Sequence, residues 1–159
     1  MPCKATFLYG IKVPLKGGDT LYASATRAYE ALDVDVQERI AGLSALHAGT
    51  NNPNQRCIHP MVVVHPETGR KILYVNRLLT QEVVGLPSKE SQSLLRYLFD
   101  RLEAEPHIYR HHWTVNDLVM WDNRSVQHAR TDFDPAEPRM LRRLTTKGAS
   151  LRSVVGATA

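Results

Sequence analysis

The spacing of apolar positions along the chain predicts a series of short strands. Residues 5–13 are rich in β-branched and aromatic side chains with partial alternation, and the run stops before a turn at residues 17–19. Residues 61–64 and 71–75 form two further apolar runs, and the Pro and Gly placement between them suits a β-hairpin. Three more strands are predicted near the end of the chain, at residues 111–114, 118–121 and 139–146.

Two helices are predicted between the first strand and the hairpin. Ser24 can cap a helix over residues 25–32. Asp35 and Glu38 have capping-box spacing, which predicts a second helix. Its apolar positions are Ile40, Leu43 and Leu46. These helices look like an insertion between strands.

A third helix is predicted from Ser88 to a point before Pro106. Its apolar residues lie on one face at a period near 3.6 residues, and they are Leu94, Leu95, Leu98, Phe99 and Leu102. Many short antiparallel strands with helices on one side are typical of a β-sandwich or jelly roll and not of a doubly wound sheet. The predicted fold class is therefore mainly β with helices (α+β).

Composition fits one globular domain large enough to bury a core, because 43% of the 159 residues are hydrophobic and 23% are charged. Cys3 and Cys57 have no metal-ligand spacing, so they are interpreted as reduced thiols. No stretch approaches the roughly 20 apolar residues that cross a bilayer, and the N-terminus lacks the apolar run of a signal peptide. We expect a cytoplasmic protein with no membrane partner.

The formal charge of +4 raises the question of a polyanionic partner. The dense basic stretch alternates with apolar residues as a strand would, and it has no interleaved aromatic residues to stack on bases. Its members are Arg139, Arg142, Arg143, Lys147 and Arg152. We therefore expect no nucleic acid partner, and a few inward arginines fit a small anionic substrate equally well.

The most informative stretch runs from Trp121 to His128 and reads Trp-Asp-Asn-Arg-Ser-Val-Gln-His. Arg139 follows His128 eleven residues later, and Arg143 follows fifteen residues later. Neutral imidazole suits Fe(II), and a guanidinium matches a carboxylate with two parallel hydrogen bonds. On one extended strand, Arg139 and Arg143 would project from the same face.

This stretch resembles the terminal motif of the TauD/TfdA (taurine dioxygenase-like) family of Fe(II)- and 2-oxoglutarate-dependent dioxygenases. The resemblance implies that His128 is an iron ligand and that Arg139 clamps the distal carboxylate of 2-oxoglutarate. It also implies that Thr20, in Gly-Gly-Asp-Thr, contacts 2-oxoglutarate, and that Arg143 lies near the acidic group of the primary substrate. The implied cofactors are Fe(II) and 2-oxoglutarate as co-substrate, and the implied partner is a small anionic substrate.

The resemblance covers almost the whole chain in the same order, at residues 17–22, 28–32, 59–60, 65–69, 73–76 and 90–91. It implies an incomplete double-stranded β-helix (jelly roll) of the clavaminate synthase-like type. We expect a dioxygenase domain over residues 1–150, N-terminally truncated, and a C-terminal tail over residues 151–159.

The family's other two iron ligands come from a His-x-Asp motif, which this sequence does not contain and which would fall before Met1. The only His-x-acid is His65-Pro-Glu67, whose place in a predicted turn favours a structural role. His111 and His112 are adjacent on a strand, so they point to opposite faces and cannot both bind one metal. The expectation is a truncated dioxygenase with impaired activity.

Plainer interpretations stand beside these roles. His128 is alternatively an ordinary strand-end histidine, and Thr20 alternatively bonds a turn amide. Asp122 and Asn123 are interpreted as turn formers that bond local backbone, and Trp121 as packing beside the site. The alternative function is a noncatalytic remnant that binds an organic anion or a partner protein through Arg139 and Arg143. An unpaired sheet edge would favour self-association, so a homo-oligomer is left open.

Overall fold

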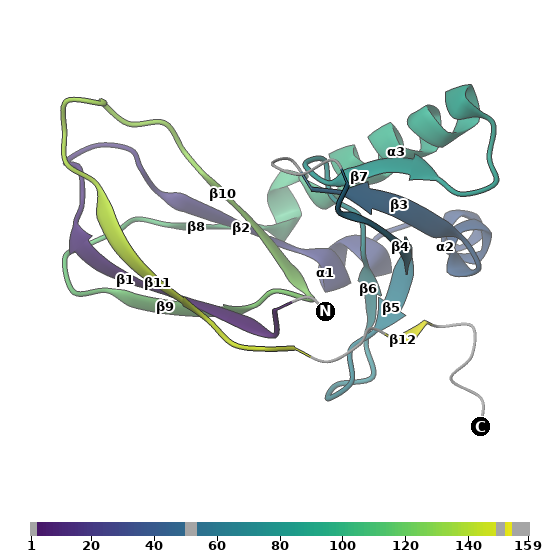
Figure 1. The fold of residues 1–159 in the computed structure, drawn as a ribbon, viewed down its shortest axis with the longest axis horizontal. Coiled ribbons are helices and arrows are strands. Elements are labelled where there is room, and N and C mark those ends of the chain that lie inside the picture. Colours follow the sequence, from purple (N-terminus) through teal and green to yellow (C-terminus); the bar gives the residue numbers. More distant parts are fainter. Residues whose placement is uncertain (1–2, 50–53, 149–151, 154–159) are drawn as a thin grey trace.

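Six strands form two facing antiparallel sheets of three strands each, which we call the barrel half (Figure 1). The first sheet has the order β11-β1-β9 and the second has the order β10-β2-β8. Their bounds are β1 Ala5–Lys12, β2 Thr20–Ser24, β8 Ile108–His111, β9 Leu118–Asp122, β10 Val126–Arg130 and β11 Met140–Thr145. The computed structural model describes residues 3–49, 54–148 and 152–153. All pairings in these two sheets join residues far apart in the sequence, such as Ala23 with Ile108 and Thr6 with Thr145, as a jelly roll requires.

Residues 25–102 form a second region, which we call the core lobe. Figure 1 shows α3 lying over β7 and β3, with β5, β6 and α1 alongside. Two small sheets have the orders β4-β3-β7 and β12-β5-β6. Their bounds, with the helices, are α1 Ala25–Glu30, α2 Val34–Ala41, β3 Ser44–Ala48, β4 Arg56–Pro60, β5 Val62–Val64, β6 Lys71–Leu73, β7 Thr80–Val83, α3 Ser88–Leu102 and β12 Arg152–Ser153. A 3-10 turn, η1 (Glu105–His107), leads back to the barrel half.

The apolar core lies in the core lobe, where helix faces pack on the inner faces of the small sheets. Its fully buried members come from all three helices and from strands β3, β5 and β6 with their flanking residues, and they include Ala28, Ile40, Ala45, Met61, Val62, Ile72, Leu73, Val75, Leu98 and Leu102. No helix in the described ranges is long and apolar enough to cross a membrane. Cys3 and Cys57 are exposed free thiols, as expected.

The transition from strand β2 to helix α1 joins the two regions. The Ser24 side chain accepts a hydrogen bond from the Arg27 backbone N–H at 3.3 Å, so the predicted N-cap is confirmed. Two further predictions hold in position and type: the first strand and the hairpin of β5 with β6.

Several local predictions were wrong. Helix α2 ends at Ala41, with Gly42 as its C-cap, and Leu43 lies outside it. Leu46 belongs to strand β3, which pairs on both sides with β4 and β7. The apolar spacing fitted a helix, but pairing with distant strands decided the outcome. The predicted helix starts were also shifted. The N-cap of α2 is Asp33, so Asp35 lies inside the helix. The N-cap of α3 is Pro87, so Ser88 is its first helical residue.

Strand predictions near the site also need correction. The strand predicted at residues 111–114 lies at β8, three residues earlier, and β10 was not predicted as a strand. Strand β11 begins at Met140, so Arg139 precedes it. Of the predicted tail 151–159, residues 151 and 154–159 lie outside the described residues, while β12 pairs with β5.

Candidate functional site between the two sheets of the barrel half

His128 lies on the inner face of the barrel half. It is the direct cross-strand neighbour of Tyr22 on β2. Its ring centroid is 4.7 Å from that of Trp121, which in turn lies 5.1 Å from the Tyr22 ring. Because β9 and β2 belong to opposite sheets, these contacts place all three rings between the sheets.

Burial first, and then the charge of Arg143, lower the pKa of His128. The neutral imidazole that results at neutral pH is the form that binds a metal. The structure thus places this predicted ligand beside the Trp121 and Tyr22 rings with its side chain accessible to solvent and its metal-binding form favoured.

Thr20 lies on the same face of β2, two residues before Tyr22. Its buried hydroxyl oxygen accepts a hydrogen bond from the indole N–H of Trp113 at 2.9 Å. The Thr20 hydroxyl proton is therefore free to donate to a further acceptor. Sequence reasoning did not identify Trp113, since no local pattern indicates this contact across 93 positions.

Arg139 reaches the site from the segment just before β11. Its Nε donates a hydrogen bond to the Gly18 carbonyl oxygen at 2.9 Å. Gly18 has φ +64°, and a Cβ there would lie 3.1 Å from Arg139 Cδ and Nε and 2.8 Å from Pro14 Cγ. A glycine is therefore required both by backbone conformation and by the close approach of Arg139. Burial lowers the pKa of Arg139, and the nearby Arg130 adds to this effect.

Arg143 faces the same interior from within strand β11. In β11 it lies opposite Leu8, while Thr6 of the same face of β1 lies opposite Trp121. Alternation along β1 puts Leu8 and Thr6 on one face, so Arg143 shares the face of Trp121. The prediction that a continuous strand orients both arginines was wrong for Arg139. Both nevertheless approach the inner side of the barrel half.

Three guanidinium groups around this interior have no carboxylate partner among the described residues. They are Arg130, Arg139 and Arg143. Other arginines nearby are neutralised, because Arg110 lies 3.5 Å from Asp19 and Arg124 lies 2.5 Å from Asp122. Three neighbouring guanidinium groups whose positive charge no carboxylate neutralises can bind a small molecule with more than one carboxylate.

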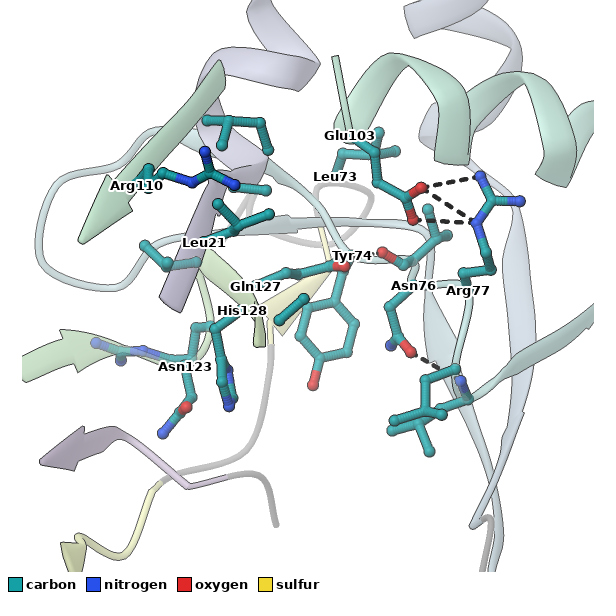
Figure 2. Close-up of a pocket in the computed structure, with 18 of the residues that line it drawn as sticks. Leu21, Leu73, Tyr74, Asn76, Arg77, Glu103, Arg110, Asn123, Gln127 and His128 are labelled. Carbon is teal, nitrogen blue, oxygen red and sulfur yellow. Dashed lines mark hydrogen bonds and ion pairs between the residues drawn. The ribbon is translucent and has the colours of Figure 1, made fainter. Parts of the chain in front are cut away.

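A cavity of about 910 Å³ opens beside His128, between the barrel half and residues 73–79 of the core lobe. Figure 2 shows His128, Asn123 and Tyr74 at this cavity, with Arg77 held by Glu103 on its far side. Leu21 and Ala23 contribute apolar wall. The cavity is large enough for a small organic molecule. Leu21 and Ala23 alternate with Thr20 and Tyr22 along β2, so the cavity lies mostly on the other face of this sheet from the Tyr22 ring.

The residues present do not fit a complete iron site. Among the described residues no three His, Cys, Asp or Glu side chains are grouped to hold a metal ion. His111 is half-buried and contacts Asp117 at 3.1 Å, while His112 is exposed and contacts Asp19 at 3.0 Å, so the predicted opposite orientation is confirmed. His128 is thus a single candidate ligand in this part of the chain.

The residues do fit a dicarboxylate. Two buried donors on the inner face, the Tyr22 hydroxyl and the Trp121 indole N–H, make no hydrogen bond with the described residues. Burial raises the pKa of Tyr22 to about 12, so the hydroxyl remains a donor at neutral pH. Buried donors without an acceptor are rare in folded proteins, and here they lie beside unpaired guanidinium groups.

A polar network links the site to the hairpin of the core lobe. His65 lies in the hairpin turn, where its Nδ1 accepts from the Glu67 and Thr68 backbone N–H groups, and its Nε2 lies 3.0 Å from Asp122 Oδ2. Asp122 also accepts from the side chain and backbone of Arg124. His65 therefore has a structural role, as predicted, and Asp122 does more than form a local turn.

Burial alone would raise the pKa of Asp122. The hydrogen bonds from Arg124 and His65 outweigh burial and lower this pKa to about 2. Asn123 exchanges hydrogen bonds with the Thr6 hydroxyl. These contacts hold the turn between β9 and β10, and with it the start of the strand that carries His128.

Comparison with known proteins identifies the family and the fold. Residues 1–145 match the family model described as taurine catabolism dioxygenase TauD, TfdA family. The α-ketoglutarate-dependent 2,4-dichlorophenoxyacetate dioxygenase of Cupriavidus pinatubonensis is 36% identical over 89% of this chain and 54% of its own length. The α-ketoglutarate-dependent sulfonate dioxygenase of Saccharomyces cerevisiae is 34% identical over 80% of this chain and 34% of its own.

Solved structures show the same fold. A taurine dioxygenase from Burkholderia xenovorans superposes with a TM-score of 0.92 at 32% identity, over 96% of this chain and 55% of that one. AAD-2, solved with Mn(II) and N-oxalylglycine, gives a TM-score of 0.88 at 28% identity over 95% of this chain and 66% of its own. The double-stranded β-helix class is therefore confirmed, and the chain spans about half the length of the curated relatives it matches. This chain belongs to the TauD/TfdA family of dioxygenases.

Proposed function

We propose that this chain carries the 2-oxoglutarate-binding part of a non-haem Fe(II) dioxygenase that hydroxylates a small anionic substrate. The overall reaction converts 2-oxoglutarate to succinate and carbon dioxide. The observation that carries the proposal is the convergence of His128 and Thr20 with unpaired guanidinium groups on one inner face.

In this proposal each residue has a distinct task. The free amino groups of Arg139 bind the distal carboxylate of 2-oxoglutarate, and the Thr20 hydroxyl donates a hydrogen bond to the same group. Arg143, which has no partner in the described structure, binds the acidic group of the primary substrate or a second carboxylate. His128 serves as one iron ligand, and iron, when bound, supplies the oxygen chemistry. The substrate binds between the two sheets, next to His128 and Arg143.

The described residues supply one candidate metal ligand, so we expect weak iron binding and negligible turnover from this chain alone. The test is 2-oxoglutarate-dependent succinate formation with Fe(II) and ascorbate. Robust turnover by these residues alone would contradict the assignment of His128 as a solitary ligand.

The second candidate is a noncatalytic anion-binding remnant, and the guanidinium groups without a carboxylate partner among the described residues favour it. Calorimetry with 2-oxoglutarate, in metal-free buffer and with Mn(II), separates the two. Binding that Mn(II) strengthens supports an iron site at His128, and binding that is independent of Mn(II) supports the remnant. No binding in either buffer would contradict both.

A further inference from the structure

Tyr22 has a hydroxyl group without a function in the folded chain. The residue is 7% exposed, and its hydroxyl makes no hydrogen bond with the described residues. Phenylalanine would fill the same space without burying an unsatisfied donor. A tyrosine in this position is therefore explained by an acceptor outside the described residues, such as a bound ligand.

Its position indicates where that acceptor lies. Tyr22 is directly opposite His128 on the neighbouring strand and two residues from Thr20 on the same face. Its hydroxyl is also within electrostatic reach of the Arg139 guanidinium. Tyr22 therefore lies between the candidate metal ligand and the candidate carboxylate clamp.

Neighbouring side chains do not supply the acceptor. The Thr20 hydroxyl lies nearby and lowers the pKa of Tyr22, as a donor to the Tyr22 oxygen does, so it does not accept the Tyr22 proton. On its other sides, the Tyr22 ring packs against Trp121 and stacks on Tyr109 with centroids 5.1 and 6.4 Å away. The contacts of the ring orient the side chain and leave the hydroxyl free to bind a ligand.

We propose that Tyr22 is a further co-substrate contact, whose hydroxyl donates a hydrogen bond to the 2-oxoglutarate carboxylate clamped by Arg139. The inference rests on the proposed function. A third donor beside Arg139 and Thr20 adds selectivity for ligands that carry a carboxylate here. A ligand without that carboxylate leaves the buried Tyr22 hydroxyl unpaired, which costs binding free energy.

The test compares wild-type protein with Tyr22→Phe, measuring the dissociation constant for 2-oxoglutarate by calorimetry and the melting temperature without ligand. We expect 2-oxoglutarate to bind Tyr22→Phe roughly ten- to a hundredfold more weakly, as for a lost hydrogen bond to a charged group. The ligand-free melting temperature should stay equal or rise, because the variant removes a buried unsatisfied donor. Unchanged affinity, or a lower ligand-free melting temperature, would overturn the inference.

Tyr109→Phe is the matched control. Tyr109 is 63% exposed and stacks on Tyr22, so removing its hydroxyl should change neither quantity. Wild-type protein that binds no 2-oxoglutarate overturns the proposed function together with this inference. Wild-type binding that Tyr22→Phe retains in full overturns this inference alone.

Discussion

The core lobe and the barrel half are built from similar short elements but bury different chemistry. The core lobe buries an almost continuous set of aliphatic side chains, such as Ile72, Leu98 and Leu102, each 0% exposed. Between its sheets, the barrel half holds aromatic rings such as Trp121 and the hydroxyl groups of Thr20 and Tyr22 on β2. Guanidinium groups without a carboxylate partner among the described residues, such as that of Arg143, lie beside them. The first arrangement stabilises a fold, and the second leaves donors and charge for a ligand. We therefore expect most of the stability to come from the core lobe and ligand binding to occur in the barrel half.

The largest change in the free energy of unfolding is expected for a substitution in the core lobe. Leu98→Ala on α3 should lower the free energy of unfolding by about 3 to 4 kcal/mol, because it leaves a cavity in a closely packed region. Chemical denaturation measures this loss. Leu118→Ala, at a 66% exposed position of the barrel half, is the control and should change stability by about 0.5 kcal/mol or less. Equal losses for both variants would contradict the assignment of the core.

The next largest change in the free energy of unfolding is expected in the polar network of Asp122, Arg124 and His65, which connects the two regions. Asp122→Asn keeps the size of the side chain but leaves the buried Arg124 with the more distant Glu67, 3.7 Å away, as its carboxylate partner, and should cost about 2 to 3 kcal/mol. Because the pKa of Asp122 is lowered to about 2, its contribution is present above its ordinary pKa and is lost as the pH falls through 2.

The control for the network is Asp100→Asn, which breaks an exposed ion pair with Arg77. Its expected cost is about 0.5 kcal/mol, measured in the same denaturation experiment. If both aspartate variants lose the same small amount, the network does not stabilise the junction.

A smaller effect is the acid sensitivity of the core lobe. Burial, and then the neighbouring His59, lower the pKa of His47 from 6.5 to about 4. The unfolded chain takes up a proton near pH 6.5 while the folded chain does not, so stability falls as the pH drops from 6.5 towards 4. The loss attributable to His47 should be about 2 kcal/mol.

His47→Phe keeps a ring against His59 and Tyr74, whose centroids lie 5.2 and 5.8 Å away, and removes the titrating group. The plot of unfolding free energy against pH should therefore be flatter for this variant between pH 6.5 and 4. A variant with the slope of the wild-type protein would show that His47 does not cause the acid sensitivity.

The smallest free-energy change is expected at the barrel half, and it concerns binding. Arg143→Gln should weaken the binding of a small organic anion by roughly five- to tenfold and leave the melting temperature unchanged, because Arg143 has no partner in the described structure. Arg142→Gln is the matched control, because Arg142 lies next to Arg143 in β11, opposite Tyr9 in the strand register, and points to the outer face. Equal weakening by the two variants, measured by calorimetry, would indicate general charge attraction instead of a site.

Local sequence determined the elements whose residues favour one structure without help from distant partners. The strand at β1, the Ser24 cap and the amphipathic face of α3 follow from propensity, capping and period. The Trp121–His128 stretch and the spacing to Arg139 likewise indicated the family and the candidate residues.

Only the tertiary structure decided the short strands and the environment of the site. Leu46 fitted a helical period, yet pairing with two distant strands made its segment a strand. The contact of Trp113 with Thr20 and the position of Tyr22 opposite His128 depend on strand register, which joins residues about 100 positions apart. Register is set by the packing of whole faces and by turn geometry, so no local pattern in the sequence specifies which side chains meet.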